Sequence, residues 1–210
     1  MDYTTKASEI VQRVLSFDAL DSGWKKVKET SDCVVYSRPS EDFKGNLYKS
    51  EGNIPASSET VFTFVYPGVE KPRRKEWDTS ISSSKVLAKP APHLDIIRST
   101  TNPVCLGLIS AREFVDLVTV TREPNRIFTA SISVEHPDAP ETKGFVRGFN
   151  HPNSLFCYAV ESKPNETRFV QYVHSDLGGM LPQSLVESAI PSTMADTYPR
   201  LKAAIAKDSA

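Results

Sequence analysis

Arg112 and Asp116 are the two side chains whose types and spacing most suggest chemistry. Asp116 is a carboxylate inside the strand-like run "EFVDLVTV", and Arg112 lies four residues before it. Two such groups can form a buried ion pair, a satisfied pair at a sheet edge or part of an acid–base site. We interpret them as a structural pair, because no nucleophile and base in the sequence are joined by a recognisable spacing.

The remaining candidate groups form no known catalytic or metal-binding motif. The sequence contains no "GxSxG", "GxxxxGK[ST]" or "HExxH", and its nine glycines never fall as "GxGxxG". His136 and His151 each precede a proline, which is typical of a turn at a strand end. His93 and His174 also lack the close His or Cys spacing of a zinc site. We therefore expect no catalytic residue, no metal and no cofactor.

The charge balance excludes a general attraction to nucleic acid. Lys plus Arg number 25 and Asp plus Glu number 26, which gives a formal net charge of -1. The densest basic run, "EKPRRKEWD", contains Lys71, Arg73, Arg74 and Lys75 but also acidic residues. It predicts a solvated turn rather than a patch for an anionic membrane or a partner.

Length and cysteine usage indicate one intracellular domain. A chain of 210 residues can bury a sizeable core, and no linker or repeat divides it, so we expect a single domain over residues 1–210. Cys33, Cys105 and Cys157 are widely separated and lie among apolar residues, which indicates reduced thiols. No secretion signal is evident, and no run approaches the roughly 18 apolar residues of a membrane span. These features predict a soluble, cytoplasmic protein.

The elements that must position these residues follow an α+β order. A short amphipathic helix around residues 10–15 precedes strands at 33–39 and 46–55, and Ser57 or Ser58 can cap a second helix. Strand patterns then cover 94–101, 113–122, 126–136, 144–151, 155–162 and 167–176. A final helix continues through Pro191 and Pro199, each of which costs roughly 3 kcal/mol inside a helix. Packing against an antiparallel sheet must hold it in place.

Two segments leave an alternative open. In the 126–134 strand Thr129, Ser131 and Ser133 alternate with apolar residues, so the hydroxyls face either solvent or a weakly polar cavity. The run "VCLGLI" at 104–109 is either a buried strand or an exposed apolar loop tip that touches a partner or a membrane.

Four motifs resemble one known family along nearly the whole chain. "GNLYKSEG", "SAREFVDLV", "GFVRGFNHP" and "SDLGGMLPQSLVESAIPSTM" are similar to the START family, the lipid-transfer domains related to the steroidogenic acute regulatory protein. They look closest to its small single-domain sterol-binding subgroup. The resemblance implies a helix-grip fold, in which a curved antiparallel sheet wraps around a long C-terminal helix and encloses a tunnel for one lipid.

The resemblance also implies positions for the tunnel and its gate. The loop that touches membranes and gates the tunnel would carry Leu106, Gly107, Leu108 and Ile109. Several sterol-binding members hold a buried carboxylate and guanidinium in the tunnel, but these positions fall here on Ser99 and Val118. A ligand hydroxyl would then use neutral groups or a bound water. The expected tunnel residues are Ile97, Ser99, Thr101, Asp116, Val118, Thr129, Ser131, Leu185, Ala189, Met194 and Tyr198.

The function expected from this resemblance is non-vesicular lipid transfer. The partner would be one sterol-like lipid, with transient contact to a membrane surface, no nucleic acid and a monomeric working form. A carotenoid, bile acid, oxysterol or phospholipid could replace the sterol, and the domain could instead be a lipid-gated interaction module. The helix-grip fold also hosts enzymes such as cyclases, for which Asp116, Arg112 and His174 would be the groups to suspect.

Overall fold

The computed structural model describes residues 2–69 and 71–208. Its helices are α1 (Tyr3–Asp18), α2 (Ser58–Val65) and α3 (Gln183–Asp208), with short 3-10 turns η1 (Arg74–Glu76) and η2 (Cys105–Gly107). The strands are β1 (Lys25–Glu29), β2 (Val34–Pro39), β3 (Asn46–Ile54), β4 (Ile81–Ala91), β5 (Leu94–Thr101), β6 (Arg112–Glu123), β7 (Arg126–Ser133), β8 (Val146–Arg147), β9 (Phe149–Asn150), β10 (Ser154–Val160), β11 (Lys163–Val173) and β12 (Ser175–Asp176).

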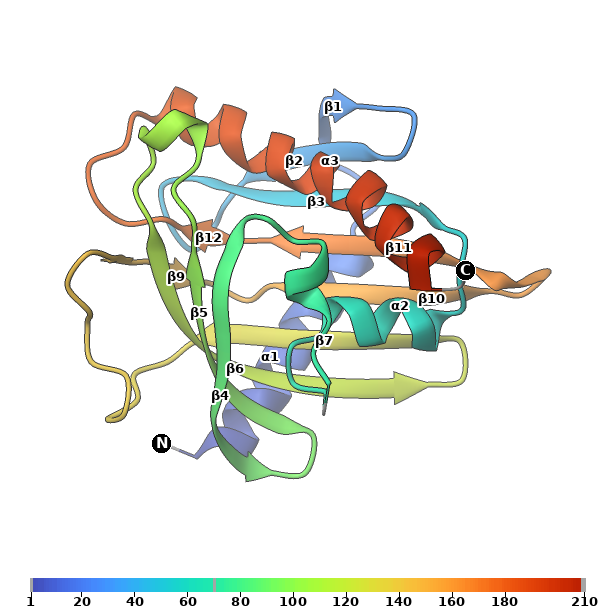
Figure 1. The fold of residues 1–210 in the computed structure, drawn as a ribbon, viewed down its shortest axis with the longest axis horizontal. Coiled ribbons are helices and arrows are strands. Elements are labelled where there is room, and N and C mark those ends of the chain that lie inside the picture. The colour runs from blue at the N-terminus through green and yellow to red at the C-terminus, as the bar shows by residue number, and fades with distance from the viewer. Residues whose placement is uncertain (1, 70, 209–210) are drawn as a thin grey trace.

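A ten-stranded sheet forms the frame of the molecule. Its strands follow the order β1-β2-β3-β11-β10-β7-β6-β5-β4, and β8 pairs in parallel with β6. Figure 1 shows α3 crossing in front of this curved sheet, with α2 beside it and α1 behind. The sheet therefore has two covered faces, and each face has its own apolar core.

The core behind the sheet is built by α1. Asp2 caps this helix by accepting from the Thr4 backbone N–H at 3.0 Å. Ile10, Val14 and Phe17 are buried at the spacing of one helix face. They share a core with Phe128, whose ring stacks on the ring of Phe156 in the neighbouring strand β10. Because alternate residues of β7 point to opposite faces, its hydroxyl-bearing residues face away from α1, toward α3.

The other face of the sheet is covered by α2 and α3. Pro191 and Pro199 both lie inside α3, as expected from the sequence. The buried residues of this helix include Ala189, Met194 and Leu201. Pro199 removes the donor that the Ala195 carbonyl would otherwise receive. That carbonyl instead lies 4.0 Å from the Cys33 Sγ, a weak replacement supplied from outside the helix. Tertiary contacts thus stabilise a helix that its own sequence weakens.

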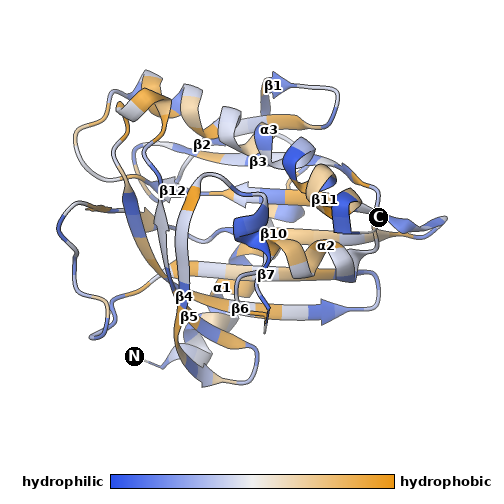
Figure 2. Ribbon diagram, in the orientation of Figure 1, coloured by the Kyte–Doolittle hydropathy of each residue, from blue (hydrophilic) through white to orange (hydrophobic). Residues whose placement is uncertain are grey.

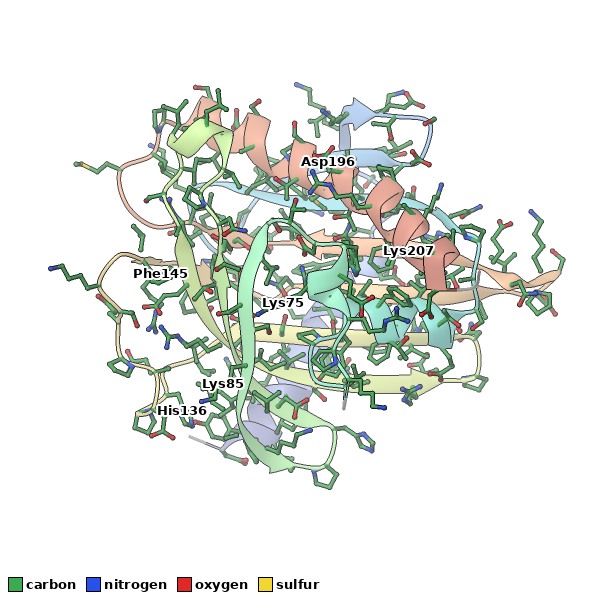
Figure 3. The ribbon with its side chains drawn as sticks, in the orientation of Figure 1. Lys75, Lys85, His136, Phe145, Asp196 and Lys207 are labelled. Atoms are coloured by element: carbon green, nitrogen blue, oxygen red, sulfur yellow. The ribbon has the colours of Figure 1, made fainter. Side chains whose placement is uncertain are left out.

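The strand expectations hold except at the edges and ends. β4 was not expected, because its polar sequence lacks alternation. It is a half-exposed edge strand, and Lys85, labelled in Figure 3, lies on it. Charged residues on an edge oppose pairing with another chain. The 144–151 pattern yields the two short strands β8 and β9 rather than one.

Candidate functional site

A cavity of about 310 Å³ lies between the sheet and α3. β5, β6, β7, β10 and β11 supply most of its sheet wall, α3 its lid, and the 104–109 loop part of its rim. Nine of the expected tunnel residues line this one space, namely Ile97, Ser99, Thr101, Asp116, Val118, Thr129, Ser131, Ala189 and Met194. Of the β7 hydroxyls, those of Thr129 and Ser131 therefore face a cavity rather than solvent.

Two of the expected tunnel residues lie elsewhere. Leu185 is half-buried in the first turns of α3 and does not line the cavity. Tyr198 is fully buried in the core, where its hydroxyl donates to the Phe169 carbonyl at 3.2 Å and lies 3.0 Å from Ser50 Oγ. The apolar stripe of α3 is wider than the cavity, so only part of it can face a ligand.

Asp116 is a carboxylate held in a fixed orientation on the cavity wall. Ser133 Oγ donates to its Oδ1 at 2.8 Å, and Asn150 Nδ2 donates to its Oδ2 at 2.8 Å. Ser133 is itself fixed by the Asn150 backbone N–H, and the Asn150 side-chain carbonyl accepts from Ser175. Burial raises the pKa of Asp116 to about 6, against the lowering effect of these two hydrogen bonds.

Arg112 does not pair with Asp116, so the structural pair expected from the sequence is wrong. Residues four apart in a strand are about 13 Å apart, too far for an ion pair. The Arg112 guanidinium donates instead to the Leu177 carbonyl at 3.0 Å, the Gly178 carbonyl at 3.3 Å and Ser110. Within the described chain no carboxylate pairs with it, although its side chain is only 3% exposed. Burial accordingly lowers the pKa of Arg112.

No pattern in the sequence indicates the partners of Arg112, but strand alternation places its side chain on the cavity face. Arg112, Phe114, Asp116 and Val118 are alternate residues of β6, and all four line the cavity. Asn150 lines it too, from the two-residue strand β9 within the 144–151 pattern, but it was not among the expected tunnel residues.

The 104–109 loop is an apolar tip and not a buried strand. Leu106 is fully exposed and Leu108 largely so, whereas Ile109 is buried and lines the cavity together with Val104. In Figure 2 apolar colour marks the corner where this loop and the start of α3 lie. Leu106 adopts a φ of 56°, a left-handed conformation that costs a leucine free energy. The turn thus presents two leucines to solvent.

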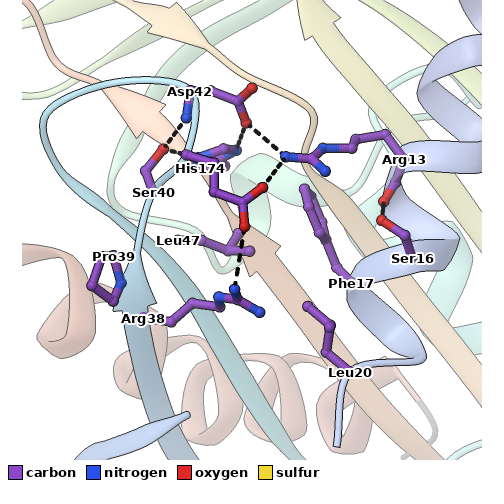
Figure 4. A pocket seen from close by; sticks show the side chains of 11 residues that line it. Arg13, Ser16, Phe17, Leu20, Arg38, Pro39, Ser40, Asp42, Leu47 and His174 are labelled. Atoms are coloured by element: carbon purple, nitrogen blue, oxygen red, sulfur yellow. Dashed lines mark hydrogen bonds and ion pairs between the residues drawn. The ribbon is translucent and has the colours of Figure 1, made fainter. Parts of the chain in front are cut away.

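A smaller cavity of about 120 Å³ lies on the α1 side of the sheet (Figure 4). His174 lines it and is buried, with its Nε2 2.7 Å from Ser40 Oγ. Because Ser40 Oγ accepts from the backbone N–H groups of Asp42 and Phe43, its own proton points to Nε2. Burial lowers the pKa of His174 to about 4. His174 does not line the cavity of Asp116, so the three residues suspected of catalysis are not brought together.

Two of the four basic residues of the run 71–75 form ion pairs. Arg73 pairs with Glu76 at 2.8 Å and with Asp208 at 2.5 Å, and Arg74 pairs with Asp78 at 2.9 Å. Lys75 lies on η1 and is labelled in Figure 3. No group of three or more potential metal ligands occurs among the described residues. None of the helices in the described ranges has the length and hydropathy to cross a bilayer.

Comparison with known proteins decides the family. The START domain model matches residues 5–209. The chain belongs to the START domain family. Mouse StAR-related lipid transfer protein 5 is 40% identical over 205 residues, which is 97% of this chain and 96% of the relative. Human StAR-related lipid transfer protein 4 is 32% identical over 206 residues, 97% of this chain and 98% of the relative.

A solved structure shows the same architecture. Human StAR-related lipid transfer protein 5 superimposes with a TM-score of 0.94 at 34% identity, covering 99% of this chain and 98% of that one. The family and the helix-grip fold expected from the motifs are therefore confirmed. The names of these relatives describe lipid transfer proteins rather than enzymes.

This START domain carries its cavity charges at positions other than 99 and 118. Ser99 lines the cavity and lies 3.2 Å from Ser84 Oγ, and Val118 is buried. The cavity charges are instead Asp116, Arg112 and the Arg74–Asp78 pair.

Proposed function

We propose that this START domain is a lipid carrier that encloses one sterol-like molecule and moves it between membranes, as a cytoplasmic monomer. The observation that carries the proposal is the cavity of about 310 Å³ between sheet and lid helix, within the roughly 300–1,000 Å³ typical of small-molecule sites. The lipid-transfer names of its relatives support the same class of function.

The expected affinity suits a carrier. A sterol has about 28 non-hydrogen atoms, and roughly -0.3 kcal/mol for each gives about -8 kcal/mol, a micromolar dissociation constant. Such binding is tight enough to hold a lipid in water and weak enough to release it at a membrane.

Delipidated protein incubated with liposomes of mixed natural lipids provides the test. The protein would be recovered by size exclusion, and the extracted lipid identified by mass spectrometry. One sterol per protein molecule supports the proposal. A phospholipid or carotenoid would contradict the sterol, and a protein recovered empty would contradict the carrier.

The apolar loop is the proposed membrane contact, so Leu106→Asp is expected to slow sterol transfer between vesicles about tenfold. Burying a leucine in an apolar phase contributes about 1.5–3 kcal/mol, and a carboxylate reverses that contribution. Transfer would be followed by dequenching of a fluorescent sterol. Val27→Asp is the matched control, because Val27 is another exposed apolar side chain, on the edge strand β1. Equal rates for Leu106→Asp and the wild type would contradict the contact.

A second ligand class, an acidic sterol derivative such as a bile acid, is favoured by one observation. Arg112 is a buried cation on the cavity wall that bonds only neutral acceptors. A ligand carboxylate would supply the opposite charge that no described residue supplies. A competition experiment that compares the dissociation constants of a sterol and a bile acid distinguishes the two ligands, because the preferred one binds more tightly.

A further inference from the structure

Asp116 retains hydrogen-bonding capacity that the protein does not use. A carboxylate offers about four lone-pair sites, and the described residues occupy two of them, one on each oxygen. The side chain keeps some accessible surface and lines the cavity. A buried carboxylate is costly unless donors satisfy it, so this wall favours a ligand that brings a donor.

Three neutral hydroxyls of the cavity wall already take part in hydrogen bonds. Ser131 Oγ donates to the Asn153 side chain, and Ser99 Oγ lies 3.2 Å from Ser84 Oγ. Thr129 Oγ1 accepts from the Leu155 backbone N–H at 3.1 Å. These contacts leave the carboxylate as the strongest free acceptor on this wall.

We propose that Asp116 determines ligand specificity in this START domain by accepting the O–H of the ligand's terminal hydroxyl, with Asn150 and Ser133 as its positioning residues. The proposal rests on the sterol-like ligand proposed above and names the group that selects within that class. A hydroxyl donates to the carboxylate, whereas a ketone at the same position sets two acceptors against each other and leaves both unsatisfied. The site therefore selects alcohols over ketones.

The other charged groups that line the cavity are less suited than Asp116 to accept a ligand hydroxyl. β5, β7 and α3 present only neutral side chains to the cavity among the residues that line it. Arg74 and Asp78 pair with each other, and Arg112, on the same strand as Asp116, is a donor to backbone carbonyls and cannot itself accept the proton of a ligand hydroxyl.

The test compares cholestanol with cholestanone, which differ only in a hydroxyl or ketone at one ring position. Each would displace fluorescent dehydroergosterol from the wild type, Asp116→Asn and the control Asp18→Asn at pH 7.5. We expect the wild type to prefer cholestanol about tenfold, since a hydrogen bond to a charged group contributes about 1.5–3 kcal/mol. The amide of Asp116→Asn can donate as well as accept, so its preference should fall to near one. Asp18→Asn should keep the wild-type preference, because Asp18 is a part-buried carboxylate on the α1 side of the sheet that accepts from Tyr158 and pairs with Arg126 outside the cavity.

A second measurement needs no variant and guards against misfolding of Asp116→Asn. Below a pH of about 6 the protonated carboxyl can donate to a ketone, so the wild-type preference should shrink between pH 7.5 and 5. The arginines do not titrate in this range, and the pKa of Asp78 is lowered by Arg74 and Ser80 against the opposing effect of burial.

The outcomes separate the two proposals. Preference for cholestanol that survives in Asp116→Asn and at pH 5 would overturn the role of Asp116. Preference lost to the same extent in Asp18→Asn would mean that the loss is not specific to the cavity carboxylate, and it would likewise overturn the proposal. Cholestanol and cholestanone binding equally to the wild type would overturn the inference while keeping the carrier function. Failure of both to bind would remove the sterol proposal and this inference with it.

Discussion

Replacing Arg112 with methionine is expected to speed ligand release about a hundredfold. The guanidinium bonds Ser110, at the base of the 104–109 loop, and the Leu177 and Gly178 carbonyls, on the approach to α3. It thereby holds together two segments that border the cavity. Loss of two charge-assisted hydrogen bonds of about 1.5 kcal/mol each lowers the free-energy cost of separating the two segments by about 3 kcal/mol. This corresponds to about two powers of ten in the rate of release.

Stopped-flow release of dehydroergosterol into excess vesicles would measure this rate. Arg98→Met is the matched control, because Arg98 lies on the neighbouring strand and bonds Glu113 and Thr142 outside the cavity. That variant removes the same group and lowers stability without touching the closure. If the two variants released ligand at the same rate, general destabilisation would explain the effect and the role of Arg112 would be refuted.

The second large effect concerns stability against pH. Between pH 7 and pH 4.5 the wild type is expected to lose about 2 kcal/mol of its free energy of unfolding through protonation of His174. The His174→Gln variant should not show this loss. The folded state holds His174 neutral, with a pKa of about 4 against 6.5 for a free histidine. The stability that this group contributes is present above pH 6.5 and is lost as the pH falls toward 4, at about 1.4 kcal/mol for each pKa unit.

Asp116 acts with the opposite sign in the same pH window. Its folded pKa of about 6 lies above the usual 3.8, so its ionisation opposes folding above pH 6. Acidification from pH 6 toward 4 therefore adds stability, by an amount similar to the loss at His174. The two effects offset each other in the wild type, and Asp116→Asn is expected to expose the loss at His174.

Urea unfolding of the wild type and both variants at pH 7, 6, 5 and 4.5 would test this pair. Comparing the change in the free energy of unfolding with pH cancels the contributions of the titratable groups that all three proteins share. The expected slopes diverge in opposite directions, upward with acid for His174→Gln and downward for Asp116→Asn. Parallel curves for all three proteins would mean that neither group is buried in the protonation state described.

Sequence patterns predicted the frame of this molecule better than its site. Alternation in β7 correctly separated Phe128 from Thr129, because opposite faces of a strand meet different surroundings. The strong motifs placed the lid helix despite Pro191 and Pro199. They could not show that Arg112 would bond carbonyls some 65 residues away, since that partnership depends on where a loop closes.

Other misses have equally physical causes. β4 went unexpected because an exposed edge strand needs no apolar alternation. Tyr198 shares the helix stripe with Met194, but one packs into the core and the other faces the cavity. A one-dimensional pattern gives the direction of a helix face, and the width of the space below it is set by the sheet.

The separation of the two cores has a consequence for how the protein can work repeatedly. The core around α1 lies mainly on the far side of the sheet from α3, and it contains no residue of α3 or of the 104–109 loop. Lifting α3 or the 104–109 loop thus breaks only one of two cooperative units. The α1 unit would keep the strands in register while the α3 unit opens to exchange its ligand. The protein would then reclose after each transfer without having to refold.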